Sequence, residues 1–161
     1  MKPKNYFYNS LKIAAENFCL SQGNKNIKVL RLSNLYGLNF KKQTYLLPTL
    51  IRNSKKNKKI NIYINEKSKK NFLNIHDAIH IIVKIIKKSK YRLYNIASNK
   101  RISIEKIVSS IKKATNCKII YSNQKEKFDE PKIDISRIKK EFKFKPNNNF
   151  DSFITDIIDK Y

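Results

Sequence analysis

The sequence predicts an α/β fold, because segments with helical periodicity and segments of strand length intermix along the whole chain. The chain has 161 residues, of which 40% are hydrophobic, and this is enough for one domain with a core. No internal repeat and no long linker divides it. We therefore expect a single α/β domain.

The first half of the chain begins with a predicted helix, which predicted strands and a further helix follow. It predicts a helix over 6–22, a strand over 27–33, a loop over 34–37, a helix over 44–56, and strands over 60–64 and 71–75. The apolar positions at helical spacing in the first helix are Leu11, Ala14, Ala15, Phe18 and Cys19. Gly23 follows that helix where a C-cap glycine is favoured. Pro48 is tolerable only near the first turn of its helix, and the lysines of 55–59 are expected at a solvated helix end.

The second half contains the strongest helix pattern. It predicts a helix over 76–88, a strand over 91–98, a helix over 103–115, a strand over 117–122, a polar link to Pro131, and helices over 134–142 and 150–161. The helix over 76–88 is expected to bury one face, widened by two further isoleucines: Ile79, Ile82, Val83 and Ile86, with Ile81 and Ile85. Ser103 is expected to cap the next helix.

The charge of the chain is strongly positive, with 36 Lys and Arg against 12 Asp and Glu and a formal net charge of +24. Such an excess attracts polyanions without sequence specificity. The cations are almost all lysine and are spread along the chain, whereas arginine is the residue suited to reading guanine and forking phosphate. We therefore expect contact with nucleic acid to be non-specific only.

The sequence carries no apolar run long enough to span a membrane and no apolar signal segment at its start. Cys19 and Cys117 lack the spacing of a metal or disulfide framework. We therefore expect a cytoplasmic protein.

Tyr8 and Lys12, in the segment YNSLK, stand four residues apart and so share one face of the first helix. A nearby ammonium stabilises the phenolate form of a tyrosine. A tyrosine in that setting can exchange a proton with a substrate hydroxyl. The same spacing also arises in any lysine-rich helix in which tyrosine packs and lysine reaches solvent, so both interpretations stay open at this point.

Two further patterns favour structural interpretations. His76 and His80 are spaced like the two histidines of a zinc helix, but no third histidine exists and the intervening acid is Asp77, so no metal site is expected. Asp77 also suits a helix start. The acidic groups Asp156 with Asp159, and Glu126 with Asp129 and Glu130, are expected to be solvated surface.

Several segments of the chain, taken in order, resemble the extended short-chain dehydrogenase/reductases, the NAD-dependent epimerase/dehydratase family of nucleotide-sugar enzymes. These segments are YNSLKIAAEN (8–17), VLRLSNLYG (29–37), LLPTLI (46–51), KNFLNIHDA (70–78), LYNIAS (93–98) and DISRIKKEFKFKP (134–146). They match the family's Tyr-x-x-x-Lys helix, its Arg-x-x-Asn-x-Tyr-Gly turn, the helix after that turn, its Arg-Asp-Phe segment, its Tyr-Asn-Ile-Gly-Ser strand end and its C-terminal Asp-x-Ser-Lys stretch. The resemblance covers essentially the whole chain.

The resemblance implies the C-terminal part of a Rossmann-like extended short-chain dehydrogenase fold, together with its small substrate-binding region. Residues 1–45 and 72–98 would be the remnant of the NAD-binding half, interleaved with a substrate-binding region at 46–71 and 99–161. The family's glycine-rich phosphate turn lies in an N-terminal half that is missing here, and with two glycines in the sequence no such turn can be written. Either the gene product is truncated or split, or another chain supplies that half.

The resemblance also implies a role for individual residues. Tyr8 would be the acid/base, and Lys12 would stabilise its phenolate and bond the nicotinamide ribose. Ser33 would border the cofactor, whereas Asn34 and Lys70 would contact the substrate. The cofactor would be NAD or NADP, and the substrate a nucleotide-linked sugar that is epimerised, dehydrated or reduced for polysaccharide biosynthesis.

The sequence departs from the family pattern at several positions, which are Leu11, Leu38, Ile64, Glu66, Lys143 and Phe144. Lys70 replaces a common arginine and therefore keeps the charge but loses the bidentate fork. We expect the chain alone to be inactive, with a separate chain or a homodimer as the assembly. The competing hypothesis is a non-enzymatic basic module that binds nucleic acid or other polyanions.

Overall fold

The structure of the protein is a computed structural model, which describes residues 3–37, 45–123, 126–147 and 149–160, with side chains from Tyr6 onward. In chain order the elements are α1 (Pro3–Ser21), β1 (Val29–Leu32), β2 (Asn34–Tyr36), α2 (Leu46–Asn57), β3 (Lys59–Ile62), β4 (Lys69–Asn74), α3 (Ile75–Lys88), β5 (Leu93–Ile96), β6 (Arg101–Ser103), α4 (Ile104–Thr115), β7 (Lys118–Tyr121), α5 (Ser136–Phe142) and α6 (Phe150–Lys160). The predicted α/β class is confirmed. Predictions that fall on Leu38, Thr44, Asn148 and Tyr161 lie outside the described residues.

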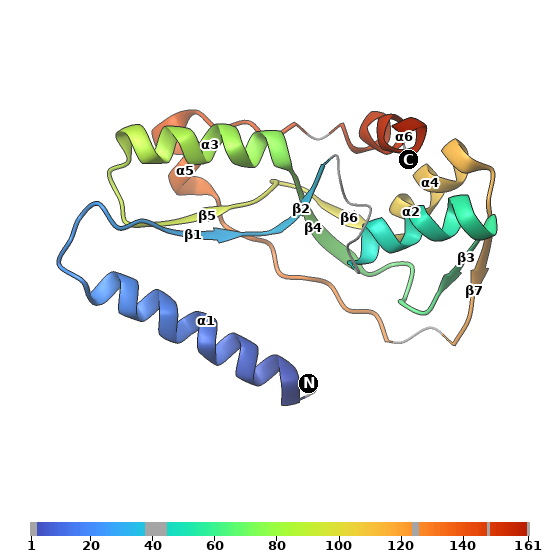
Figure 1. The fold of residues 1–161 in the computed structure, drawn as a ribbon, viewed down its shortest axis with the longest axis horizontal. Helices are drawn as coiled ribbons and strands as arrows, with labels where there is room; N and C mark the ends of the chain where they lie inside the picture. Colours follow the sequence, from blue (N-terminus) through green and yellow to red (C-terminus); the bar gives the residue numbers. More distant parts are fainter. Residues whose placement is uncertain (1–2, 38–44, 124–125, 148, 161) are drawn as a thin grey trace.

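The described strands form three small sheets. β1 pairs with β5 in parallel, β3 pairs with β7 in parallel, and β4 lies between β2, which is parallel to it, and β6, which is antiparallel. Figure 1 shows α3 on one side of β1 and β5 and α1 on the other, with α2, α4 and α6 gathered at the far end around β3 and β7. Parallel strands joined through helices give the architecture that the sequence predicts.

Ser33 marks the point where the chain passes from one sheet to the next. Its backbone N–H donates to the Ile96 carbonyl oxygen at 3.1 Å, which continues the pairing of β1 with β5, and Asn34 then lies opposite Phe72 of β4. The prediction of a loop over 34–37 is therefore wrong. A three-residue strand forms there because β4 offers it a pairing edge, which a local pattern of four residues does not reveal.

The buried side chains form two apolar clusters. The first joins α2, α4 and α6 to β3 and contains Leu47, Ile51, Ile60, Ile107, Ile111 and Ile154 among others. The second joins α3, β5 and α5 and contains Leu73, Ile81, Ile85, Tyr94, Ile96 and Ile138 among others. Tyr36 and Phe72 reach the first cluster from β2 and β4, so the central sheet connects it to the rest of the molecule.

The helix α3 begins as predicted and buries two of the expected residues, Ile81 and Ile85, but much of the rest of the expected face is exposed. The Asn74 side chain caps it by accepting from the His76 N–H at 2.8 Å, and Asp77 lies in its first turn. Ala78, Ile81 and Ile85 are buried, whereas Ile79, Val83 and Ile86 are 52%, 44% and 71% exposed. Apolar residues surround most of this helix, so the sequence pattern alone could not select the buried face.

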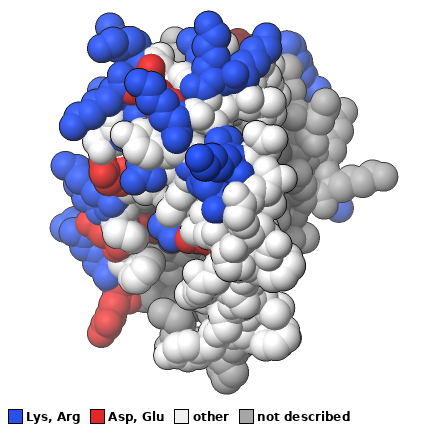
Figure 2. Space-filling model, turned by 90° about the vertical axis from the view of Figure 1, so that its left-hand side faces the viewer, with Lys and Arg blue, Asp and Glu red and all other residues white. Residues whose placement is uncertain are grey.

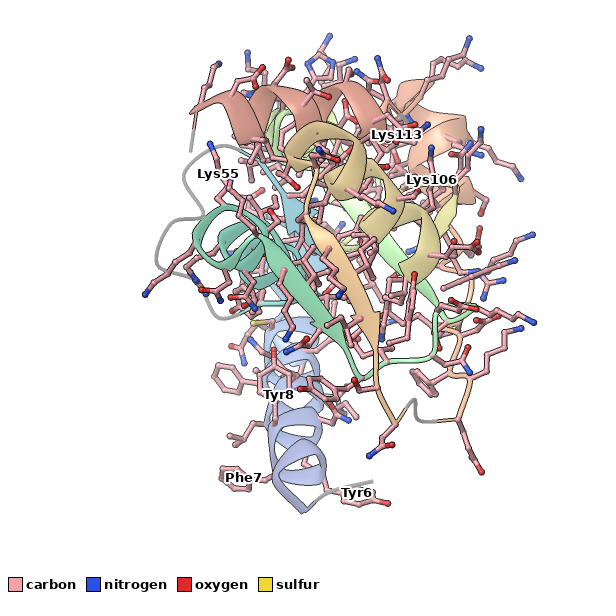
Figure 3. All side chains as sticks on the ribbon, turned by 90° about the vertical axis from the view of Figure 1, so that its right-hand side faces the viewer. Tyr6, Phe7, Tyr8, Lys55, Lys106 and Lys113 are labelled. Atoms are coloured by element: carbon pink, nitrogen blue, oxygen red, sulfur yellow. The ribbon has the colours of Figure 1, made fainter. Side chains whose placement is uncertain are left out.

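The helix α1 forms as predicted but most of its apolar residues are exposed. Leu11 is 54% exposed and Phe18 67% exposed, and Figure 3 shows Tyr6 and Phe7 projecting from the N-terminal end of α1 away from the body of the protein. The Arg31 guanidinium of β1 forms an ion pair with Glu16. This contact ties the middle of α1 to β1.

The C-terminal end of α1 is capped by Arg92, which precedes β5. Its guanidinium donates to the carbonyl oxygens of Cys19 at 2.6 Å and Leu20 at 2.8 Å. Gly23 lies beyond the helix end, and its φ is not positive, so the predicted C-cap glycine is not used as one. The Arg92 guanidinium therefore pairs the carbonyl groups at the end of the helix. From the local sequence, this role was expected of a cap at Gly23.

Basic side chains cover much of the described surface. Figure 2 shows lysines and arginines gathered over the upper part of one face, while the lower part, at the height of α1, is largely uncharged. Among the helices that the structure describes, none combines the length and the apolar character that crossing a bilayer requires.

Candidate active site

Four of the five predicted site residues line one pocket. Its volume is about 690 Å³, and Tyr8, Ser33, Asn34 and Lys70 all contribute to its wall. The other lining residues are Leu35, Tyr36, Gly37, Tyr45, Leu46, Leu47, Pro48, Ile64, Phe72, Ile75 and Glu130. A pocket of this size accommodates a small organic ligand, and its apolar walls with a few polar groups are typical of such sites.

Tyr8 reaches the pocket from α1, where Lys12 lies one turn further along the helix. The Lys12 Nζ lies 5.5 Å from the centroid of the Tyr8 ring. Lys12 is not among the residues that line the pocket. Tyr8 is 59% exposed, and its phenol is therefore accessible to a ligand from the pocket side.

Ser33 contributes a buried hydroxyl without a partner. Its Oγ is inaccessible to solvent and forms no hydrogen bond with the described residues. A buried polar atom left unpaired is unfavourable and marks a position where a ligand group can bind. The chain positions this hydroxyl at the junction between β1 and β2, where the two sheets meet.

Asn34 and Lys70 are held together by a carboxylate from a distant segment. The Lys70 Nζ lies 3.3 Å from the Glu130 Oε1, and the Asn34 Nδ2 donates to the Asn71 carbonyl oxygen at 3.0 Å and to Glu130 at 3.4 Å. The prediction that Asp129 and Glu130 are solvated surface is therefore wrong. Both are partly buried and paired, because the segment after β7 runs beside β4.

Aromatic side chains form the floor of the pocket. The rings of Tyr36 and Phe72 lie edge to face with centroids 6.5 Å apart, and both are buried. Burial raises the pKa of the Tyr36 phenol above its ordinary value, and the nearby Asp77 carboxylate adds to this effect. The tyrosine therefore stays neutral over the physiological range and serves as an apolar wall.

Gly37 allows the chain to pass Ile75 at the edge of the same pocket. A Cβ atom at position 37 would lie 2.2 Å from Ile75 Cγ2, a distance that no side chain tolerates. Sequence reasoning missed Ile75, Phe72 and Glu130 as pocket residues. The close approach at Gly37 could have been suspected, because the chain has only one other glycine.

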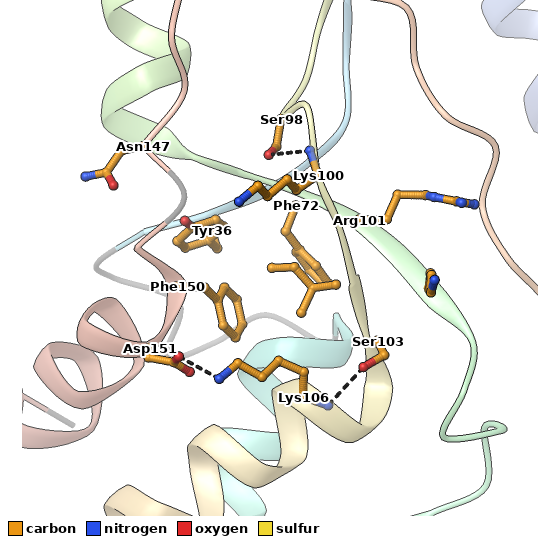
Figure 4. Close-up of a pocket in the computed structure, with 12 residues that line it drawn as sticks. Tyr36, Phe72, Ser98, Lys100, Arg101, Ser103, Lys106, Asn147, Phe150 and Asp151 are labelled. Atoms are coloured by element: carbon orange, nitrogen blue, oxygen red, sulfur yellow. Dashed lines mark hydrogen bonds and ion pairs between the residues drawn. The ribbon is translucent and has the colours of Figure 1, made fainter.

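A second, smaller pocket of about 280 Å³ lies on the other side of Tyr36 and Phe72. Figure 4 shows Lys100 and Lys106 beside it, with Lys106 paired to Asp151. The Lys106 Nζ lies 2.6 Å from the Asp151 Oδ2, and this ammonium holds the pKa of the carboxyl below its ordinary range. Of the side chains that line this pocket, Ser103 was expected from the sequence, as a helix cap and not as a site residue.

The two histidines of the segment HDAIH are both exposed on α3. Within the described residues, no group of three or more His, Cys, Asp or Glu side chains converges as a metal site would require. Asp156 and Asp159 are exposed on α6, as predicted.

The residues present fit one end of the dinucleotide that the resemblance implies. The unpartnered Ser33 hydroxyl and the accessible Tyr8 phenol provide polar groups for a ribose and a ring amide. Neither Gly23 nor Gly37 stands in a glycine-rich turn before a helix, so the described residues contain no cradle for the pyrophosphate.

Comparisons with known proteins identify the relatives of this chain. A sequence model of the NAD dependent epimerase/dehydratase family matches residues 2–97. A search of curated proteins finds no match.

Solved structures with the same fold include three sugar-nucleotide enzymes. ADP-L-glycero-D-manno-heptose-6-epimerase from Helicobacter pylori is 25% identical, with a TM-score of 0.76 over 92% of this chain and 48% of that chain. UDP-N-acetylglucosamine 4-epimerase from Bacillus cereus is 23% identical, with a TM-score of 0.67 over 82% of this chain and 47% of that chain. The dTDP-glucose 4,6-dehydratase from Bacillus anthracis, solved in complex with NAD, is 22% identical, with a TM-score of 0.69 over 81% of this chain and 43% of that chain.

The chain therefore spans about half the length of the solved structures that it matches. The family match covers more than half of this chain, and the structural matches agree with it over most of the described fold. The chain belongs to the NAD-dependent epimerase/dehydratase family.

Proposed function

We propose that this chain provides the substrate-binding and proton-transfer part of an NAD(P)-dependent enzyme that epimerises, dehydrates or reduces a nucleotide-linked sugar. The observation that carries the proposal is the convergence of Tyr8, Ser33, Asn34 and Lys70 on one pocket. They come from α1, from the β1–β2 junction and from β4, so a purely local pattern does not explain their meeting. The family match gives this convergence its chemical meaning.

Tyr8 holds or accepts the proton of a sugar hydroxyl at its phenol oxygen. Lys12 lies one turn along the same helix, with its ammonium 5.5 Å from the centroid of the Tyr8 ring. Tyr8 and Ser33 would hold the nicotinamide end of the cofactor, which would supply hydride exchange at the carbon that carries this hydroxyl. Ser33, whose hydroxyl has no hydrogen-bond partner among the described residues, borders the cofactor end of the site.

Asn34 and Lys70 bind the nucleotide side of the substrate. Lys70 offers an ammonium to a phosphate oxygen, and Asn34, whose Nδ2 donates to the Asn71 carbonyl oxygen, offers its amide oxygen as an acceptor. The apolar walls from α2, which include Leu46 and Pro48, exclude water around the ligand.

A calorimetric titration with UDP tests the substrate part of the proposal. Lys70→Ala is expected to weaken UDP binding roughly tenfold, the loss of one charge-assisted hydrogen bond. Lys69→Ala is the matched control, because it removes the same charge at the adjacent position. Lys69 lines the second, smaller pocket and not the one that contains Lys70. Equal losses in the two variants would mean that UDP responds only to net charge, and the proposed site would be wrong.

The chain alone binds NAD weakly or not at all and is inactive, and a separate chain or a second copy completes the site. This part of the proposal is supported by the lack of a glycine-rich turn and by exposed apolar side chains such as Phe7, Leu32 and Ile86. Titration of the purified chain with NAD by calorimetry tests it. Tight NAD binding without a partner would refute it.

The second candidate function is a non-enzymatic module that binds polyanions, and the net charge of +24 favours it. A basic surface attracts DNA regardless of function, so the informative result is a sequence preference. Duplex DNA binding that falls steeply with salt and shows no preference among sequences is expected from charge alone. A clear preference for one sequence would favour this candidate over the enzyme.

A further inference from the structure

Glu130 is the acidic residue among those that line the 690 Å³ pocket, and several donors contact its carboxylate. Its Oε2 accepts from the Asn71 backbone N–H at 2.7 Å and from the Asn71 Nδ2 at 3.3 Å, and its Oε1 lies 3.3 Å from the Lys70 Nζ. Both oxygens also lie 3.4 Å from the Asn34 Nδ2. In a chain with only 12 acidic residues, this one lies against two side chains of the proposed substrate site.

The backbone around Glu130 is fixed beside β4. The Glu130 N–H donates to the Lys69 carbonyl oxygen at 2.9 Å, and the Glu130 carbonyl oxygen accepts from the Arg101 guanidinium at 2.7 Å. The next carbonyl, that of Pro131, accepts from the Asn71 Nδ2 at 3.0 Å. These contacts fix the backbone from which the Glu130 side chain extends toward Lys70.

The contacts of Glu130 leave little capacity for a ligand hydroxyl. A carboxylate has about four acceptor positions, and the donors from Asn71, Lys70 and Asn34 use most of them. What Glu130 still offers to the pocket is its negative charge, which neutralises Lys70. A phosphate that approaches Lys70 therefore meets an ion pair and not a free ammonium.

We propose that Glu130 is a specificity-determining residue: it positions Asn34 and Lys70 and, by its charge, limits the affinity of the pocket for phosphate. This inference rests on the proposed function of the same pocket. A ligand phosphate at Lys70 lies within a few ångströms of the carboxylate, and like charges at that distance repel appreciably in a partly buried site. Removing the charge while keeping the acceptor oxygen is therefore expected to strengthen phosphate binding.

The test compares UDP with uridine, which lacks the phosphates. Glu130→Gln is nearly isosteric and keeps one carbonyl oxygen for the Asn71 N–H. We expect the ratio of UDP affinity to uridine affinity to rise roughly tenfold in this variant, on the scale of one close charge repulsion in a partly solvated site. Glu126→Gln is the control, because Glu126 is exposed and its replacement changes the net charge equally. An equal rise in both variants, or no rise in Glu130→Gln, would overturn the proposal.

Pyrophosphate separates this inference from the proposed function. If UDP and uridine bind to no variant, the proposed function is wrong, and pyrophosphate is then titrated against the isotope-labelled chain while the Lys70 and Asn71 amide resonances are followed. A lower half-saturation concentration in Glu130→Gln than in wild type and Glu126→Gln would still support the charge effect at Lys70. Equal concentrations in the three proteins would overturn it.

Discussion

The Arg92 guanidinium donates to the Cys19 carbonyl oxygen at 2.6 Å, so a residue just before β5 determines where α1 ends. The same side chain also donates to the carbonyl oxygens of Leu20 and, at 3.4 Å, of Ile27. Because α1 carries Tyr8, the fork of Arg92 and the Glu16–Arg31 ion pair together set the direction from which the phenol enters the pocket.

Replacing Arg92 is expected to free α1. Arg92→Leu removes charge-assisted hydrogen bonds to helix carbonyls, and the free energy of opening α1 should fall by about 1–2 kcal/mol. Arg92→Lys keeps the charge but loses the forked guanidinium, so it should restore little of the lost free energy. Hydrogen exchange of the α1 amides measures the effect, with Lys87→Gln on the exposed side of α3 as the control. Unchanged α1 protection in Arg92→Leu would contradict the capping role.

The attachment of α1 should also depend on pH through Glu16. The hydrogen bond from Arg31 lowers the pKa of Glu16 below its ordinary value of 4.5. A lowered pKa means that the stabilisation is fully present above the ordinary value and is lost as pH falls through the lowered one. Exchange of the α1 amides should therefore accelerate in that acidic window for the wild type. Glu16→Gln should show no such acceleration of exchange in this pH window. An acceleration of equal size in this variant would mean that another group causes it.

Gly37→Ala is expected to destabilise the protein at the pocket edge. The added Cβ would lie 2.2 Å from Ile75 Cγ2, and overpacking of this kind typically removes about 1–3 kcal/mol from the free energy of unfolding. The urea midpoint measures the change. Adding Ile75→Ala removes the Cγ2 atom and should recover part of the loss. A Gly37→Ala protein as stable as the wild type would show that the chain does not pass Ile75 this closely.

The exposed apolar side of α1 should cause association. Phe7 and Phe18 are 70% and 67% exposed, and the helix carries few charges in an otherwise basic chain. Phe7→Glu combined with Phe18→Glu should shift the protein toward a monomer in concentration-dependent size-exclusion chromatography. Tyr63→Glu, at a position 56% exposed and outside α1, is the control. A wild-type chain that is a clean monomer at all concentrations would count against a partner on α1.

The sequence predicted the elements better than it predicted their buried faces. The Ser103 cap forms as expected, with its Oγ accepting from the Lys106 N–H at 3.2 Å, because a cap is a local interaction. On α3 the expected burial of Ile81 and Ile85 is confirmed, whereas the expected burial of Ile79, Val83 and Ile86 is wrong. Apolar residues surround this helix, so only tertiary packing selects the buried face. The strand β2 was missed because β4 stabilises it from 38 residues away, as in the pairing of Asn34 with Phe72.

In the candidate site too, the features that depend on local sequence were predicted and those that depend on long-range contacts were not. The resemblance selected Tyr8, Ser33, Asn34 and Lys70, all of which line one pocket. Glu130 was assigned to the surface because nothing in its neighbouring residues indicates that the segment after β7 returns to β4. Its contacts to Asn71 and Lys70 depend on a separation of about 60 residues and exist only in the folded chain.

The central claim is that these four residues form one ligand site, and a nuclear magnetic resonance titration with UDP-glucose tests it most directly. We predict saturable shifts of the Ser33, Asn34 and Lys70 amides and of the Tyr8 ring, all with one dissociation constant. The amides of Lys100 and Lys106, at the second pocket, should move little. Shifts confined to the second pocket, or spread over the lysine-rich surface without saturation, would contradict the claim.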